Sequence, residues 1–290
     1  MLWLSLSLAT ALAVSLEDVF AKRFFGQGSA ARMLSVLMFY SLPGCLAGAL
    51  WLPVPHLGPQ FWWSFWLDQP INGLSMWLYM RAIKLSPISL TMPLLALTPA
   101  ILALLGWLFL DETLSWVGVL GILVLVLGGY LLFAGEGETG LWGPFRALAK
   151  DAGARTMLLV ALLFSFSTLL GKVSVENSDA LWHAFFFNLV QDLWMLPLFW
   201  VLGWFRLAEL KGQWKPGLLV SGFYLSHMVL HNLAVILAQA AYMMSVKRLN
   251  LVFSVILGRL VLKETKTELR GLAAGVMVLG VVLISLWGKD

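Results

Sequence analysis

The chain has little charge and almost no cysteine. Asp, Glu, Lys and Arg make up 12% of its 290 residues, about half the usual share in a soluble domain. The single cysteine, Cys45, excludes an intramolecular disulfide, and no Cys/His spacing typical of a zinc site is present. Neither a Ser-His-Asp nor a His-Glu-x-x-His arrangement occurs. We therefore expect no enzyme, no cofactor and no bound metal.

Apolar residues dominate what is present. The chain is 60% hydrophobic and holds 15 Trp and 18 Phe. A membrane span needs about 20 apolar residues, so ten spans would use about 200 residues and leave no aqueous domain. This excludes a soluble enzyme, a nucleic-acid-binding protein and a disordered chain. The net charge of +4 needs no nucleic acid, because cytoplasmic loops of membrane proteins are usually basic.

Ten continuous apolar runs predict ten transmembrane helices, because bilayer hydrocarbon offers no water to free backbone groups. The first run is interpreted as a retained span, since it lacks the basic start of a signal peptide. The predicted spans are 2–21, 33–52, 62–83, 87–110, 114–134, 155–174, 181–204, 217–237, 240–262 and 268–287.

The two halves of the chain repeat each other. Leu104–Thr113 (LLGWLFLDET) matches Ile256–Thr265 (ILGRLVLKET) at six of ten positions, and Ser15 and Lys22 match Ser165 and Lys172. Each half holds five spans, and five is odd, so the second half enters the membrane inverted. We predict an all-α integral membrane fold of two inverted five-helix repeats around a central cavity. The repeats cover 1–134 and 155–290, joined by a loop at 135–154.

Loop charge predicts the orientation. Fourteen of the 19 Lys and Arg residues fall near odd-numbered loops, whereas even-numbered loops and tails hold only Lys172 and Lys289. Positive loops stay inside, so we expect odd-numbered loops in the cytoplasm and both termini outside. The membrane expected is a bacterial cytoplasmic (inner) membrane.

These motifs resemble a known family. The run from Tyr79 to Pro87, continuing through Pro93 and Pro99 to the Asp-Glu-Thr at 111–113, is similar to the EamA-type branch of the drug/metabolite transporter superfamily. The run from Ala241 to Arg248, continuing to Lys263-Glu-Thr265, looks like its second copy. The resemblance implies a carrier whose cavity is lined by helices one to four and six to nine, with glycine-marked helices five and ten at the periphery.

Two features depart from this resemblance. Ser245 and Leu251 stand in helix nine where helix four has Pro93 and Pro99. The family also implies cytoplasmic termini, against the loop charges. The three prolines of helix four predict breaks or kinks there, whereas 240–262 is expected to be one helix.

Charged residues inside spans are the first candidate site, because a mid-bilayer charge usually faces a partner or a cavity. Lys247 and Arg248 lie seven to eight residues into the ninth span. Adjacent helical residues point about 100° apart, so we expect at least one of the two to reach the cavity. An anion site for a carboxylate or phosphate is one hypothesis. Ion pairs to Asp68 or Asp192, or snorkelling to the interface, are the alternatives.

Polar residues on two other spans are further candidates. Asp68 and Asn72 share a helix face, as do Asn188, Gln191 and Asp192. Their carboxylates could bind a substrate amine or carry a coupled proton, or the groups could serve helix–helix hydrogen bonding. His227 and His231 are four residues apart, a spacing suited to proton relay, substrate stacking or structural hydrogen bonds.

Other polar residues are expected to be structural. His183 is expected at the membrane interface. Glu17 and Asp18 are expected to pair locally with Lys22 near a helix end. Glu112 and Glu264 are interpreted as helix-start signals.

The sequence thus predicts a secondary transporter that works by alternating access. Its expected substrates are small polar or zwitterionic metabolites, amino-acid-like molecules or organic anions, with or without a coupled proton or counter-substrate. The alternatives are a flippase of a phosphorylated lipid and a multidrug-type exporter of cationic or aromatic compounds. The expected surroundings are lipid, with no nucleic acid, and a homodimer through the glycine-bearing helices is considered.

Overall fold

The computed structural model describes residues 1–85, 92–134, 150–262 and 270–287, and within these ranges it is all helical. Most of the predicted connecting loop 135–154, the start of the fourth predicted span and Glu264 lie outside the described residues. The long helices are α1 (Leu2–Phe25), α2 (Ala30–Trp51), α3 (Phe61–Leu85), α5 (Thr98–Phe109), α6 (Trp116–Ala134), α8 (Ala152–Glu176), α9 (Ala180–Val201), α10 (Trp214–Val235), α12 (Asn250–Leu262) and α13 (Arg270–Trp287). Shorter elements are η1 (Met92–Leu97), η3 (Leu207–Leu210) and α11 (Ala240–Lys247).

Each predicted span corresponds to helix in the described chain, and two spans are interrupted. The fourth consists of η1 followed by α5, and the ninth of α11 followed by α12. Five helices, α1, α2, α8, α9 and α10, are long and apolar enough to cross a membrane by length and composition. Large apolar side chains such as Trp51 and Trp116 are more than 80% exposed, as expected for residues that face lipid. The protein is an integral membrane protein.

Polar residues fix where several helices begin. The Ser29 hydroxyl accepts a hydrogen bond from Arg32 N at the start of α2. Asp151 does the same for Ala154 N at α8, and Asp179 for Leu181 N and Trp182 N at α9. Such caps satisfy backbone donors that the first helical turn leaves free.

The break in the fourth span follows from proline, and the break in the ninth does not. Pro99 lies in the first turn of α5, where a missing backbone N–H costs nothing. The expectation that 240–262 is one helix is wrong. After Lys247 the backbone forms a tighter turn, in which Leu249 N donates to the carbonyl oxygen three residues earlier, Val246 O, at 3.0 Å. The Ser15 hydroxyl of α1 donates a hydrogen bond to the carbonyl oxygen of Asn250 at 2.9 Å, which holds the start of α12.

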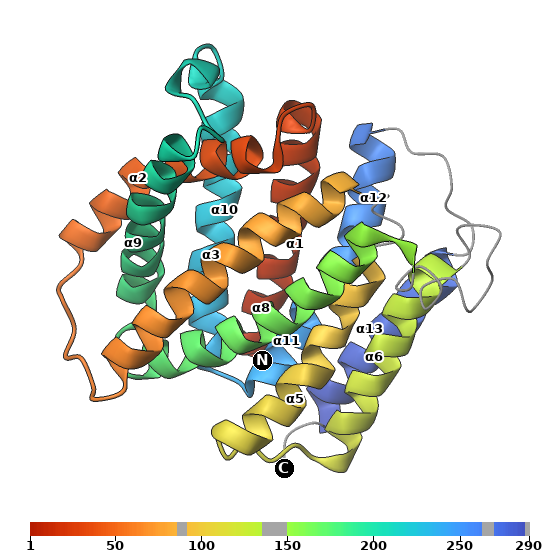
Figure 1. Ribbon diagram of the computed structural model, residues 1–290. Helices are drawn as coiled ribbons and strands as arrows, with labels where there is room; N and C mark the ends of the chain where they lie inside the picture. Colours follow the sequence, from red (N-terminus) through yellow and green to blue (C-terminus); the bar gives the residue numbers. More distant parts are fainter. Residues whose placement is uncertain (86–91, 135–149, 263–269, 288–290) are drawn as a thin grey trace.

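Helix packing is symmetric under exchange of the two halves (Figure 1). Helix α3 packs on α8, and α1 packs on α10 in the equivalent way. In the same manner α5 packs on α8 and α12 on α1, while α2 packs on α9 and α6 on α13. These pairings are those of an inverted repeat, since they match the third helix of each half with the first helix of the other.

Glycines allow α6 and α13 to approach closely. A Cβ at Gly128 would lie 2.6 Å from Met277 N, and one at Gly280 would lie 2.7 Å from Gly121 O. Small residues of this kind let helix backbones meet in a membrane. Gly121, Gly128 and Gly280, among the glycines considered for a homodimer, therefore pack within the chain.

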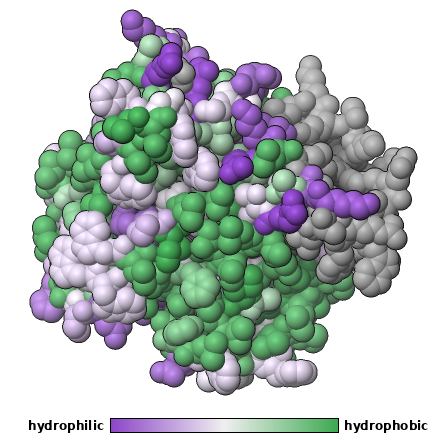
Figure 2. Space-filling model, in the orientation of Figure 1, coloured by the Kyte–Doolittle hydropathy of each residue, from purple (hydrophilic) through white to green (hydrophobic). Residues whose placement is uncertain are grey.

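The helices divide the connections between two faces of the molecule. Connections 52–60, 110–115, 177–179 and 236–239 lie on the face that holds Met1, which we call the Met1 face (Figure 1). Helix α13 ends there too, where the Ser115 hydroxyl meets Trp287 O at 3.1 Å. Figure 2 shows a broad hydrophobic area over the middle of one side of the molecule, with hydrophilic residues gathered mainly toward its upper edge.

Candidate functional site

A cavity of about 150 Å³ lies between the two halves. A single water needs only about 10–15 Å³ of such space, so the cavity has room for several waters or one small metabolite. One wall comes from α3 and α8, and the other from α1, α10 and α11. The resemblance implied that helices one to four and six to nine line it. Among the described residues α2 contributes none, and neither do α6 and α13.

Both members of the cationic pair face this cavity. Lys247 ends α11 and Arg248 lies in the turn before α12, and each is a lining residue. The expectation that adjacent cations diverge by 100° assumed a continuous helix, which the structure does not have at this point. Because the chain forms a turn there instead of a continuous helix, both positive charges reach the same cavity.

The cations have neutral partners. Arg248 Nε donates to the Thr98 hydroxyl at 2.7 Å, and Lys247 Nζ lies 3.4 Å from His231 Nδ1. Within the described ranges neither forms an ion pair, so the alternative of a salt bridge to Asp68 or Asp192 is not observed. Glu17 and Asp18 lie within electrostatic range of Lys247 without contacting it.

Glu17 and Asp18 are cavity residues that the sequence interpretation placed elsewhere. Glu17 is 6% exposed, and its Oε2 accepts from His227 Nδ1 at 2.8 Å. Asp18 Oδ2 accepts from the Tyr79 hydroxyl at 3.0 Å. The expected local pairing with Lys22 is therefore wrong, because α1 runs on to Phe25 and holds both carboxylates two turns from its end.

Asp68 and Asn72 line the opposite wall. Asn72 donates to the Ser167 hydroxyl of α8 at 2.9 Å. Asp68 is 3% exposed, and its Oδ1 has no hydrogen-bond partner among the described residues. A buried carboxylate oxygen left without a partner is costly unless a ligand or water satisfies it.

Three of the four histidines, His183, His227 and His231, line the cavity. His227 contacts Glu17, and His231 contacts Lys247. His183 was expected at the interface, but it is 3% exposed and bonded on both ring nitrogens. Its Nδ1 lies 2.9 Å from Asn232 Oδ1 and its Nε2 lies 2.6 Å from the Ser174 hydroxyl. The ring is therefore fixed in the wall.

The three polar residues of α9 meet three different neighbours. Asn188 lines the cavity and accepts from the Tyr224 hydroxyl at 2.7 Å. Gln191 faces Gly73 of α3, and Asp192 accepts from the Ser41 hydroxyl of α2 at 3.0 Å. Gln191 and Asp192 thus lie at helix contacts, outside the cavity lining.

Seven of the nine predicted site residues therefore surround one cavity: Lys247, Arg248, Asp68, Asn72, Asn188, His227 and His231. Within the described chain no group of three His, Cys, Asp or Glu side chains could hold a metal. The cavity presents the two cations and the carboxylates Glu17 and Asp18 on one wall, and the carboxylate Asp68 on the other. This arrangement can bind a small molecule that carries charges of both signs.

Comparisons with known proteins agree with this architecture. The EamA-like transporter family matches residues 1–134 and again residues 152–286. A solved structure described as "Crystal structure of protein" superposes with a TM-score of 0.69 at 18% identity, covering 97% of this chain and 98% of that chain. A comparison with curated proteins finds no match.

Proposed function

Because the chain belongs to the EamA-like transporter family, we propose that it carries small metabolites with both an anionic group and an amine, by alternating access through the central cavity. That the chain is a membrane transporter of the drug/metabolite type follows from the family. The class of substrate is the proposal.

The observation that carries it is the pair of cations without ion-pair partners among the described residues. Lys247 and Arg248 converge on the cavity from the interruption between α11 and α12. A guanidinium and an ammonium favour a carboxylate or a phosphate. Glu17 and Asp18 lie within electrostatic range of Lys247 without contacting it, so a ligand anion would supply the direct ion-pair contact that the described side chains do not make.

The opposite wall supports recognition of an amine. Asp68 on α3 presents a buried oxygen with no partner among the described residues. A substrate ammonium would satisfy this oxygen while its anionic end meets Lys247. Neutral groups such as Asn72 and Asn188 can then bind the remaining polar atoms.

The test is a thermal-stability measurement on detergent-purified protein with matched probes. The probes are L-amino acids, their amides, which lack the carboxylate, and the related acids, which lack the amine. A ligand at 100 times its Kd adds about 2.7 kcal/mol of stability. We expect the zwitterions to raise Tm in the parent but not in Lys247→Gln or Asp68→Asn.

Asp192→Asn is the matched control, because it neutralises a buried carboxyl that lies outside the cavity. It should retain the ligand-induced shift. Equal stabilisation of the parent and Lys247→Gln by lipophilic cations would instead indicate a drug-type exporter. A response to phosphorylated lipids alone would indicate a flippase.

A further inference from the structure

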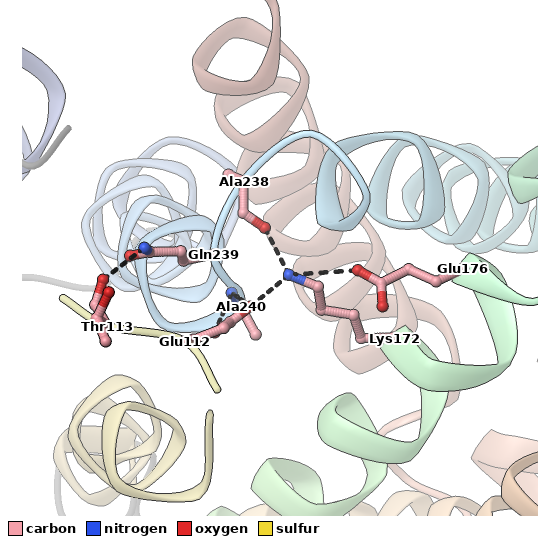
Figure 3. A network of polar contacts seen from close by, with 7 residues as sticks. All are labelled: Glu112, Thr113, Lys172, Glu176, Ala238, Gln239 and Ala240. Carbon is pink, nitrogen blue, oxygen red and sulfur yellow. Dashed lines mark hydrogen bonds and ion pairs between the residues drawn. The ribbon is translucent and has the colours of Figure 1, made fainter. Parts of the chain in front are cut away.

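The connection 110–115 reaches from the first half of the chain to the second (Figure 3). The Glu112 carboxylate pairs with Lys172 Nζ of α8 and accepts from Ala240 N at 3.1 and 3.2 Å. Lys172 also donates to Ala238 O at 2.9 Å. Glu112 was interpreted as the start signal of its own next helix. The structure corrects this: it caps α11, in the other half.

The end of α5 explains why Glu112 can reach this point. Gly106 O accepts from Leu110 N at 2.9 Å and from Glu112 N at 3.1 Å, and Asp111 adopts a positive φ of 52°. These two bonds to one carbonyl fold the chain back over the end of α5. A Cβ at position 106 would lie 2.7 Å from Glu112 Oε2, so glycine leaves room for the carboxylate.

This geometry accounts for the repeated motif of the sequence. The Gly106-to-Glu112 spacing recurs as Gly258-to-Glu264, and Lys172 has its counterpart in Lys22. Lys172 was counted with the loops, but it is 7% exposed and belongs to α8. Its side chain therefore contacts other parts of the protein and does not contribute to the loop charge that predicts orientation in the membrane.

The contact lies next to the Met1-face end of the cavity. Gly171 and Val235 line the cavity, next to Lys172 and three residues before Ala238. Gln239 Nε2 donates to Thr113 O at 2.7 Å, and Gly58 N donates to Asn177 O at 2.9 Å. Each of these bonds also joins the first half to the second on this face.

Helix α11 joins this contact to the cationic pair. Its first residue, Ala240, is held by Glu112, and its last residue, Lys247, lines the cavity. Eight helical residues span about 12 Å. A helix this short moves as a rigid body, so a displacement of Ala240 also displaces Lys247.

We propose that Glu112 and Lys172 form a gate that closes the cavity on the Met1 face, and that α11 transmits substrate binding to this gate. The side chains are 10% and 8% exposed. Separating them would take the counter-charge from Glu112 and leave Lys172 only the half-exposed Glu176 as a carboxylate partner, so opening has to admit water. The gate is therefore either closed and dry or open and hydrated, as alternating access requires. The proposal rests on the chain being a carrier, and not on the class of substrate.

The experiment measures access to the cavity and needs no substrate. Thr168→Cys, one turn from Lys172 in the cavity wall, is placed in a Cys45→Ser background. A membrane-impermeant maleimide is added to intact cells or to inverted vesicles. We expect Glu112→Gln to raise labelling from the Met1 face roughly tenfold, the scale of one lost charge-assisted hydrogen bond.

Glu176→Gln is the matched control. Glu176 lies 3.7 Å from Lys172 on the same helix, so its loss removes a carboxylate without breaking a contact between the halves. Its labelling should equal that of the parent. Equal labelling of Glu112→Gln and the parent, or an equal increase in Glu176→Gln, would overturn the proposal.

Gly106→Ala provides a second variant if Glu112→Gln does not fold. It retains every charge, but its Cβ displaces the Glu112 carboxylate, and it should also raise labelling from the Met1 face. Normal labelling in this variant would count against the gate. Because labelling is read without ligand, failure here is distinct from failure of the amino-acid probes.

Discussion

At the residue scale, the carboxylates of α1 show that burial within a helix, rather than closeness to its end, determines which partner a side chain meets. Glu17 meets His227 across the interface between α1 and α10. Its contact is a hydrogen bond between titratable groups, both less than 10% exposed. Such a contact joins the first helix of one half to the third helix of the other, and so contributes to holding the wall of the cavity.

The Glu17–His227 contact should appear as a coupling energy. In a double-mutant cycle of Glu17→Ala and His227→Ala, we expect coupling of about 0.6–1.7 kcal/mol, the range for hydrogen bonds within membranes. Unfolding by denaturing detergent is the measurement. The cycle of Glu17→Ala with His231→Ala should be additive, because His231 contacts Lys247 instead. Comparable coupling in both cycles would contradict the assignment.

Spacing along a helix predicted part of the candidate site and missed part of it. It predicts which side chains share a face, but not which neighbour each one meets. Asn188 and Asp192 are one turn apart, yet one lines the cavity and the other contacts α2. Glu17 and Asp18 were missed because the first helix is four residues longer than predicted. Their distance from the end of that helix is the signal that would have found them.

At the element scale, interrupted helices position the charged groups. The prolines of the fourth span predict its interruption from the sequence. The interruption of the ninth depends on contacts such as that of Ser15 with Asn250 O, which arise only when α1 packs against α12. The ten spans were predictable from hydrophobic length. The second interruption was not, because tertiary packing determines it.

The α6–α13 contact allows a prediction at this scale. Gly128→Ala places a Cβ against the backbone of Met277, so we expect a loss of about 1–3 kcal/mol, as in overpacked cores. Gly275→Ala on the same pair of helices meets nothing within 4 Å. It should be neutral or stabilising by about 0.4–1 kcal/mol. Thermal unfolding of both variants tests this, and a harmless Gly128→Ala would show that the helices can separate without cost.

At the scale of the whole molecule, the two halves contact each other through equivalent pairs of helices. The match of α3 with α8 and of α1 with α10 follows from the internal repeat and from an odd number of spans in each half. The architecture was therefore predictable from two short motifs. The contents of the cavity were not, because they depend on which side chains the halves turn toward each other.

Orientation in the membrane remains a prediction from loop charge, and it can be tested with fusions. If both termini are outside, alkaline phosphatase fused after Asp290 will be active and green fluorescent protein at the same place will be dark. A fusion after Lys211, on the opposite face, should give the reverse pattern. Fluorescence from the C-terminal fusion would mean that the Met1 face is cytoplasmic.

The eight residues of α11 also have a thermodynamic consequence. If occupancy near Lys247 shifts the contact at Ala240 by some factor, closure of that contact must shift the occupancy by the same factor. A dissociation constant measured for this carrier then describes the cavity and its closure together. Variants of Glu112, which touch no ligand, would change that constant as surely as variants of Lys247 do.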